Sequence, residues 1–371
     1  MRITCQQDTL NQALQTVQIA VPSKAQIPVL SGIYLNAEDG CLQLQASDHQ
    51  TSMIYTMEAE VAEPGEMVVS GRYFYDLIRR LPSQTVTLSK EISSNTLKLV
   101  STEEASGSYD YQLLTIPPQD FPVLKPQEGR ISFSIWDHVL KDLVKKTYFS
   151  CSSDEARPIF TGCLIEINEG VIQMIATDTH RMALAQNGVE PATTTAKMIV
   201  PAKLLNEICR IVPANTQIQV HVLDGQVAFV FGSVYLVTRL IQGQFPDYRK
   251  VLLTQVQTQA TIDTQQWLLA MERIFLLVRE GKYNTVRMFF KEDHLSIVYS
   301  NPDIGSASES VSCQLEGNEL EIAFNARFLL DILKNIDSEQ CTIALNTSLS
   351  PAAIRPVGES QYTYVVTPMR I

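Results

Sequence analysis

Three copies of one helix pattern recur along the chain, and this repetition constrains the fold more than any other feature. The copies read SGRYFYDLIRRLP from Ser70, PAKLLNEICRIVP from Pro201 and NARFLLDILKNID from Asn325, and they align without gaps. The two intervals between these starting points are each close to one third of the chain length. Self-similarity at a near-constant period marks repeated structural units. The sequence therefore predicts three units of similar fold.

Each copy has the apolar spacing of an amphipathic helix. Apolar residues recur at i, i+3, i+4 and i+7, which places them on one helix face. The three sets are Phe74, Leu77, Ile78 and Leu81; Leu205, Ile208, Cys209 and Val212; and Leu329, Ile332, Leu333 and Ile336. We expect this face to pack into the core of each unit.

A second helix is predicted upstream of each copy. Its apolar markers are Leu10, Ala13, Leu14 and Val17, with Asp8 as N-cap; Trp136, Leu140, Leu143 and Val144; and Trp267, Leu268, Met271 and Phe275. The rest of each third alternates in the manner of short antiparallel strands, as at 41–47, 85–90, 217–231 and 294–300. Each third is therefore expected to be an α+β unit with two helices packed on antiparallel sheets.

Proline-rich stretches separate the thirds. TIPPQDFPVLKP begins at Thr115 and GQFPDYRKV at Gly243. Proline fixes φ and stiffens a connection. We therefore place three domains at 1–126, 127–253 and 254–371.

Charged positions also recur in the three helix copies. Arg72, Lys203 and Arg327 are equivalent, as are Arg79, Arg210 and Lys334, with an acid between them at Asp76, Glu207 and Asp331. One interpretation is ion pairs within each helix, each worth a few tenths of a kcal/mol. The other is that the helices present cations to one common polyanion. The net charge of −11 opposes general affinity for nucleic acid, but the placement of the cations decides.

The stretch ATDTHRMAL, from Ala176, concentrates an acid, an imidazole and a guanidinium in four residues. ASDHQTSM, from Ala46 in the first third, aligns with it without gaps and shares the small hydroxyl residue and the aspartate. We expect both aspartates, Asp48 and Asp178, to form an Asx-type turn after a strand. His180 and Arg181 have no basic counterparts in the first copy, so they distinguish the second.

Several classes of site and location are not indicated. The seven cysteines are scattered and form no CxxC, which is typical of reduced thiols in a cytoplasmic protein. The five histidines form no HExxH, and neither GxxxxGK[ST] nor GxGxxG occurs. No apolar run has membrane-spanning length, and no apolar export segment follows Met1. We therefore expect no metal, no cofactor and no membrane partner.

ATDTHRMAL, GQFPDYRKV and the terminal YTYVVTPMRI, together with the triple repeat, resemble the bacterial DNA sliding clamps, the beta subunits of the replicative DNA polymerase III. The resemblance extends from IPVLSGIYL at Ile27 to the last residue. It implies three clamp domains per chain and a head-to-tail homodimer, a six-domain ring with helices lining a central hole. It also implies a non-catalytic processivity factor that encircles duplex DNA without sequence preference.

The resemblance further implies a pocket for short apolar peptides, through which the ring tethers its partners. These are the polymerase catalytic subunit, the clamp loader, and repair and ligation proteins that carry clamp-binding peptides. The implied pocket residues are Phe160, Thr177, Thr179, His180, Arg181, Met182, Pro246, Val251, Val365, Val366, Pro368, Met369 and Arg370. Thr367 stands where the family often has a bulky apolar residue, and we expect it to alter peptide preference.

Two further surfaces follow from the resemblance. The DNA-facing cations are expected to be Lys24, Arg72, Arg79, Arg80, Lys203, Arg210, Arg327 and Lys334. The dimer seam is expected to join Tyr111 and Leu113 to Leu276 and Leu277.

Two alternatives stay open at the level of sequence. One is a clamp-like paralogue with specialised or non-replicative partners. The other is a hydrolase that uses Asp178 and His180 with a hydroxyl such as that of Ser47, although no GxSxG motif is present.

Overall fold

The computed structural model describes residues 1–82, 84–90, 95–103, 107–129, 131–253, 255–279, 284–358 and 361–370. The chain forms two compact units. Unit 1 comprises Met1–Asp137 and Arg210–Leu240, and unit 2 comprises His138–Cys209 and Ile241–Ile371. The division passes through the middle third because strands of that third extend the sheets of both neighbours.

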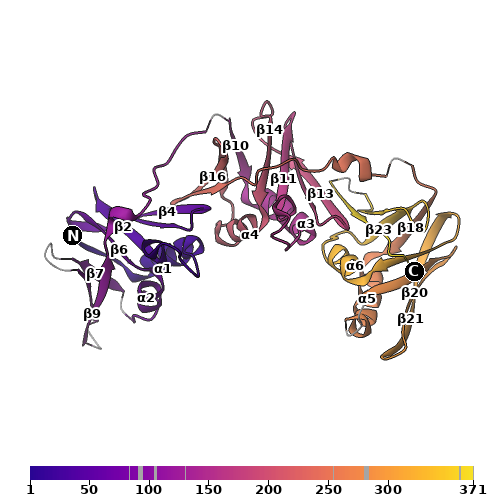
Figure 1. The fold of residues 1–371 in the computed structure, drawn as a ribbon, viewed down its shortest axis with the longest axis horizontal. Coiled ribbons are helices and arrows are strands. Elements are labelled where there is room, and N and C mark those ends of the chain that lie inside the picture. The colour runs from indigo at the N-terminus through magenta and orange to yellow at the C-terminus, as the bar shows by residue number, and fades with distance from the viewer. Residues whose placement is uncertain are drawn as a thin grey trace. The chain divides into compact units, whose positions relative to one another are not determined.

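Unit 1 contains a 13-stranded antiparallel sheet with helices packed on it (Figure 1). The strand order is β10-β15-β16-β17-β4-β3-β2-β6-β9-β8-β7-β1-β5. The elements are β1 (Arg2–Gln6), α1 (Gln7–Val17), η1 (Gln18–Ala20), η2 (Pro28–Ser31), β2 (Gly32–Glu38), β3 (Cys41–Ser47), β4 (Thr51–Glu58), β5 (Glu60–Glu63), β6 (Gly65–Ser70), α2 (Gly71–Ile78), β7 (Thr85–Ser89), β8 (Thr96–Glu103), β9 (Gly107–Ile116), η3 (Pro118–Asp120), β10 (Ile131–Trp136), β15 (Gln217–Val222), β16 (Gln226–Phe231) and β17 (Val234–Arg239).

Unit 2 contains a 12-stranded antiparallel sheet in the order β14-β11-β12-β13-β25-β24-β23-β18-β21-β20-β19-β22. Its elements, with two helices that extend slightly into unit 1, are α3 (Asp137–Thr147), η4 (Tyr148–Ser150), η5 (Pro158–Phe160), β11 (Gly162–Asn168), β12 (Val171–Thr177), β13 (Arg181–Gly188), β14 (Ala196–Pro201), α4 (Ala202–Ile211), η6 (Tyr248–Val251), β18 (Thr258–Asp263), α5 (Thr264–Val278), β19 (Thr285–Phe290), β20 (His294–Asn301), β21 (Gly305–Gly317), β22 (Leu320–Asn325), α6 (Ala326–Leu333), β23 (Gln340–Leu345), β24 (Ala352–Pro356) and β25 (Tyr362–Val366). Helices α5 and α6 pack on each other and lie side by side in Figure 1.

The predicted helices are confirmed. The repeated pattern forms α2, α4 and α6, and the helices predicted upstream form α1, α3 and α5. The equivalent residues Phe74, Leu205 and Leu329 are fully buried, so the apolar phase of the repeat is the core face. Two details of the helix predictions are wrong. Trp136 ends β10 with 47% of its surface exposed, and Asp8 lies inside the first turn of α1, whose N-cap is Gln6.

Strands from different thirds pair directly, and these pairings hold the thirds together. In unit 1, β17 pairs with β4 from Val234↔Tyr55 to Thr238↔Thr51. In unit 2, β25 pairs with β13 from Arg181↔Val366 to Ala185↔Tyr362. In both cases the last strand of one third joins the sheet of the third before it. We call the β4–β17 pairing the first junction and the β13–β25 pairing the second junction.

Membrane-crossing helices are not part of this architecture as far as the described residues go. Every helix there is too short or too polar to traverse a bilayer.

The repeated core position predicts a contrast between neighbours on one helix. Leu205→Ala in α4 removes a fully buried side chain and should lower the free energy of unfolding by about 2–5 kcal/mol. Lys203→Ala changes an exposed residue two positions earlier and should cost less than about 0.5 kcal/mol. Urea unfolding followed by circular dichroism measures both variants. Equal losses of stability would contradict the assignment of this face to the core.

Candidate functional site

The Thr177–Arg181 turn is shaped by the aspartate predicted from sequence. Asp178 Oδ1 accepts hydrogen bonds from the backbone N–H groups of His180 (2.9 Å) and Arg181 (3.0 Å), and Thr179 adopts a φ of 81°. The first copy forms the same turn, with Asp48 accepting from the backbone N–H of Thr51 at 2.7 Å. Such a carboxylate satisfies backbone donors that a tight turn leaves open. The prediction of an Asx turn is confirmed in both copies.

Arg181, one of the expected pocket residues, is turned inward and its donors are engaged within the fold. Its Nε donates to Asp178 Oδ2 at 3.0 Å, its Nη1 to Asp331 Oδ2 at 2.7 Å and its Nη2 to the carbonyl oxygen of Phe149 at 2.5 Å. The rings of Phe149 and Phe328 lie 5.5 Å and 4.6 Å from the guanidinium carbon. Only 10% of the side chain is exposed. Arg181 therefore joins parts of the fold, whereas its neighbour His180 is exposed.

The C-terminal tail is fixed to this turn. The backbone N–H and the hydroxyl of Thr367 both donate to the carbonyl oxygen of His180, at 2.9 Å and 2.8 Å. Two residues later the backbone N–H of Met369 donates to the carbonyl oxygen of Ala323 at 2.8 Å. Thr367 thus acts as a polar anchor, whereas an apolar residue there has no hydroxyl to bond His180. Met369 is left exposed beside the anchored backbone.

Apolar side chains gather beneath the tail. This group, the junction cluster, consists of the buried residues Leu164, Ile175, Met182, Leu184, Ile199, Phe245, Tyr248 and Val365, with Ile159, Ile241 and Leu252 packed against it. Half-buried Phe160 lies near it, with its ring centroid 6.4 Å from that of Phe245.

The junction cluster collects some of the expected pocket residues and excludes another. Met182 and Val365 are members, and exposed Val251 belongs to the same short helix as Tyr248. Pro246, between Phe245 and Tyr248, is exposed, as are Thr179 and Arg370. Val366 is fully buried, because adjacent residues of a strand face opposite sides of the sheet. Its expected role as a contact residue stays a prediction.

Glu166, which the sequence reasoning missed, binds the connecting segment between the middle and final thirds, which begins at Gly243. Glu166 accepts hydrogen bonds from the hydroxyl of Tyr248 (2.8 Å) and from Arg249 (2.7 Å), and it pairs with Lys197 at 2.8 Å. Partial burial by itself would raise the pKa of Glu166, but these three donors outweigh it and lower the pKa. A charged Glu166 thus holds the segment that contributes Phe245 and Tyr248.

Leu349 is a second residue that the sequence reasoning missed. It is 71% exposed in the turn between β23 and β24. The same turn accepts a hydrogen bond from the backbone N–H of Gln257 through Asn346 Oδ1 at 3.1 Å, which places it beside the end of the connecting segment. The available sequence signal was a single leucine within the otherwise polar run NTSLSP.

The first junction has an apolar group of its own, but different residues form it: Ile54, Ala228, Tyr235 and Val237, with Leu124, Leu223 and Val230 packed against them. Gln45 and Ser52 occupy the positions equivalent to Ile175 and Met182 when the first copy of the turn is aligned with the second. Gln45 is buried, and its Oε1 accepts a hydrogen bond from the backbone N–H of Leu124 at 2.9 Å. Gln45 thereby binds the segment from Thr115 that connects the first and middle thirds. The hydroxyls of Ser47 and Ser52 bond each other at 2.8 Å. The two junctions therefore differ in chemistry at these aligned positions, which are apolar at the second junction and polar at the first.

The expected DNA-facing cations are all exposed: Lys24, Arg72, Arg79, Arg80, Lys203, Arg210, Arg327 and Lys334. Some are engaged with acids. Asp76 pairs with Arg80 at 3.0 Å, and Lys334 pairs with Glu272 at 3.1 Å. Exposed pairs of this kind contribute about 0–1 kcal/mol. They leave the cations able to exchange an internal partner for a phosphate.

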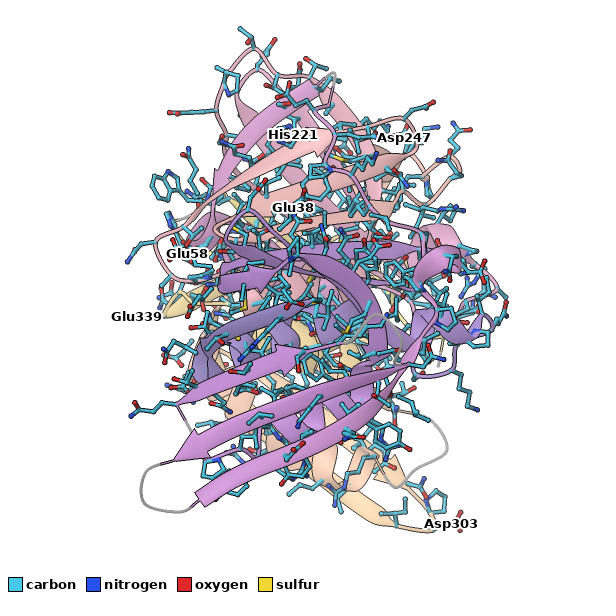
Figure 2. All side chains as sticks on the ribbon, turned by 90° about the vertical axis from the view of Figure 1, so that its left-hand side faces the viewer. Glu38, Glu58, His221, Asp247, Asp303 and Glu339 are labelled. Carbon is cyan, nitrogen blue, oxygen red and sulfur yellow. The ribbon has the colours of Figure 1, made fainter. Side chains whose placement is uncertain are left out.

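Acidic residues are concentrated outside the helices. The six α-helices contain eight of the 29 Lys and Arg residues and seven of the 40 Asp and Glu residues. Figure 2 labels five exposed acids on strand ends and connecting segments: Glu38, Glu58, Asp247, Asp303 and Glu339. The helical surface is thus nearly neutral, whereas the strands and connections carry the excess negative charge.

The expected seam residues lie on two elements. Tyr111 and Leu113 lie two residues apart on β9, so they face the same side of the strand, and Tyr111 is exposed. Leu276, which is 58% exposed, and half-buried Leu277 lie near the end of α5.

The hydrolase alternative is wrong. The Asp178 carboxylate is occupied by two backbone N–H groups and Arg181. The His180 ring stacks on Phe328, with centroids 6.3 Å apart. The geometry therefore holds a turn and provides no acid–imidazole pair.

Comparison with known proteins agrees with this geometry. Family models of the DNA polymerase III beta subunit match in order: the N-terminal domain at residues 1–125, the central domain at 134–247 and the C-terminal domain at 249–370. The beta sliding clamp of Staphylococcus aureus is 29% identical, with 100% of this chain and 99% of the relative covered. That of Bacillus subtilis is 28% identical with both chains fully covered.

Solved structures show the same similarity. The DNA polymerase sliding clamp from Bacillus subtilis superposes with a TM-score of 0.95 at 27% identity, covering 100% of this chain and 99% of that one. The DNA polymerase III subunit beta from Pseudomonas aeruginosa gives a TM-score of 0.93 at 30% identity with both chains fully covered. Matched along nearly its whole length, the chain belongs to the DNA polymerase III beta subunits, the bacterial sliding clamps, a family of non-catalytic processivity factors.

Proposed function

We propose that two copies of this chain close head to tail into a six-domain ring around duplex DNA. The observation that carries the proposal is a pair of strand edges, one in each unit, that have no strand partner among the residues the structure describes. In unit 2, residues 305–312 of β21 pair with β20 on one side, whereas β18 joins the opposite edge of β21 only from residue 313 onward. In unit 1, residues 107–114 of β9 pair with β8, and β6 joins the opposite edge only near Ile116.

The two junctions within the chain indicate how these edges are used. The last strand of the middle third, β17, pairs with β4 of the first third, and the last strand of the final third, β25, pairs with β13 of the middle third. By the same rule β9, the last strand of the first third, pairs with β21 of another copy. Such a contact joins two different surfaces, and it closes when the rotation permits. Tyr111 and Leu113 lie on β9, and α5 packs against β21, which supports the expected seam.

The exposed cations of the helices are proposed to contact DNA phosphates inside the ring. Phosphate contacts position a duplex without reading its sequence, which is what a protein that slides requires. The excess acid on strands and connections supports this arrangement, because it disfavours DNA on the other surfaces.

The junction cluster, with His180, the anchored tail and the exposed Val251, Met369 and Leu349, is proposed as the site for partner peptides. Methionine, valine and leucine provide an adaptable apolar surface, and His180 provides a polar contact at its rim. A sliding clamp from Pseudomonas aeruginosa has been solved with griselimycin bound, which supports a ligand site in this family. The proposed partners are the polymerase catalytic subunit, the clamp loader, and repair and ligation proteins with clamp-binding peptides.

Domain borders and location are part of the proposal. We propose three domains at 1–126, 127–253 and 254–371, supported by the family matches at 1–125, 134–247 and 249–370. We propose that the ring acts in the cytoplasm, supported by the free state of all seven cysteines.

A seam mutation tests ring closure and function together. Leu276→Asp places a charge on α5 one turn after Arg273. Arg273 pairs at 2.7 Å with Glu309 of β21, the strand proposed to join the other copy. Burying that charge should yield monomers in sedimentation at micromolar concentration. Wild-type protein assembled by a clamp loader should remain on nicked circular DNA and leave it after linearisation.

The matched control is Leu269→Asp, an exposed leucine two turns earlier on the same helix. This variant should stay dimeric and remain on the circle. If wild-type protein left circular and linear DNA equally fast, topological linkage would be excluded.

A triple substitution tests the DNA-facing surface. Changing Arg79, Arg210 and Lys334 together to Glu should abolish the residual affinity for duplex DNA, because each equivalent helix end loses a phosphate contact. Each lost contact should flatten the slope of log affinity against log salt by roughly one unit. Fluorescence anisotropy across a salt series measures this slope.

The control for that experiment carries the same change in charge on connecting segments. It replaces the exposed residues Lys125, Lys250 and Lys291 by Glu. Equal losses in the two triple variants would show that net charge alone, and not the helix surface, sets DNA affinity.

Truncation of the tail tests the peptide site. Deleting Thr367–Ile371 removes the anchored tail and should abolish binding of a Gln- and Leu-rich clamp-binding peptide in calorimetry, while the dimer persists. His180→Ala should weaken binding by about 1 kcal/mol, the usual size of one lost hydrogen bond. A shorter deletion of Ile371 alone keeps both tail anchors and Arg370, and should retain most of the affinity. Undiminished binding after the longer deletion would refute the assignment.

A further inference from the structure

We propose that Asp331 is a positioning residue of the peptide site: through Arg181 it sets the spacing between α6 and the Thr177–Arg181 turn, and thereby holds the C-terminal tail in place. This inference rests on the proposed peptide site and adds a residue that does not itself belong to the expected contact set. It concerns the ordering of the tail before any peptide arrives.

The C-terminal tail, from Thr367 onward, is hydrogen-bonded to two separate elements, the Thr177–Arg181 turn and β22. At the N-terminal side of the tail, the N–H and the hydroxyl of Thr367 donate to the carbonyl oxygen of His180. Met369 is fixed at the other side, where its N–H bonds the carbonyl oxygen of Ala323 in β22. β22 runs directly into α6, whereas His180 precedes β13. The tail keeps both bonds only while β22–α6 and the turn stay at one distance.

The Arg181–Asp331 pair is a direct bond between those two elements. Arg181 begins β13, and Asp331 lies in α6, 150 residues later. The Nη1 to Oδ2 distance is 2.7 Å, and the exposed fractions of the two side chains are only 10% and 17%. A partly buried ion pair with direct hydrogen bonds is screened little by solvent. The ring of Phe328, also in α6, covers the guanidinium.

Both charged groups are oriented by further partners. Arg181 uses Nε for Asp178 and Nη2 for the carbonyl oxygen of Phe149, so its planar fork reaches three segments at once. Asp331 uses its second oxygen for Arg327 Nε at 3.1 Å. The Phe149 segment continues to Ser152, whose N–H bonds the carbonyl oxygen of Phe160 at 2.8 Å. The pair therefore also connects α6 to the segment that bonds Phe160, one of the expected residues of the peptide site.

The arrangement is specific to the second junction. In the first third the residue equivalent to Arg181 is Thr51, in the aligned copy of the turn. Asp76, equivalent to Asp331 on the repeated helix, pairs with Arg79 and Arg80 at the end of its own helix. The same helix position thus serves a local role in α2 and a long-range role in α6.

The test compares Asp331→Asn with Asp76→Asn in the full-length protein. Asp331→Asn should raise the dissociation constant of the Gln- and Leu-rich peptide about tenfold, and Asp331→Glu, which keeps the carboxylate, should recover most of that loss. Asp76→Asn should leave the constant unchanged. Arg181→Lys keeps the charge but cannot reach three acceptors, so it should weaken binding to a similar degree. Because both changes break the same pair, the double variant should be no weaker than either single variant.

A second readout needs no peptide. Hydrogen exchange at the Thr367 and Met369 amides should accelerate at least tenfold in Asp331→Asn and Arg181→Lys, because protected amides exchange when their bonds open. Exchange in the β18–β23 pairing should not change, which separates tail release from general loosening.

The outcomes distinguish this inference from the function on which it rests. Failure of the wild-type protein to bind the peptide would refute the proposed peptide site, whereas tail exchange would still report on Asp331. Unchanged tail exchange in both variants overturns the positioning role. Faster exchange with an unchanged dissociation constant overturns it as well, because the tail would then be released without consequence for the site.

Discussion

The structure depends on backbone pairing between strands that belong to different thirds of the chain. Each third alone would expose a sheet edge with unpaired N–H and C=O groups, and such an edge pairs readily with another strand. At β4–β17 and β13–β25 the next third fills that edge. A single chain with three thirds can fill two edges and must leave one strand open at each end of the series. The proposed assembly would thus follow from the repeat and would need no additional domain.

Identical backbone pairing does not give the two junctions identical chemistry. At the first junction, Gln45 binds the connecting segment through Leu124, and the hydroxyls of Ser47 and Ser52 satisfy each other. At the second, Ile175 and Met182 contribute to an apolar cluster beside a chain end that is anchored by three backbone-directed bonds. Polar side chains that satisfy each other offer little to a ligand, whereas apolar side chains near the surface gain free energy when a ligand covers them. This divergence at aligned positions supports the proposal that the peptide site lies at the second junction.

The sequence was sufficient for features determined within a short stretch. The repeated helices and the turns at Asp48 and Asp178 depend on residues a few positions apart, and the structure confirms them. Features that depend on distant segments were beyond it. Glu166 meets Tyr248 and Arg249 across 82 and 83 residues, and Arg181 meets Asp331 across 150. The full burial of Val366 was also beyond it, because the register with β13, and not the local sequence, decides which face a strand residue occupies.

The acids beside the helix cations suggest a physical basis for the proposed combination of holding DNA and moving along it. Cations without partners would bind phosphates tightly and resist translocation. Here Asp76 engages Arg79 and Arg80, Asp331 engages Arg327, and Glu272 engages Lys334. At these paired cations a phosphate would have to displace an internal partner, so the proposed net gain per contact is small. In the proposed ring, such weak and exchangeable contacts would leave retention of the duplex to topology and would place little friction on its passage.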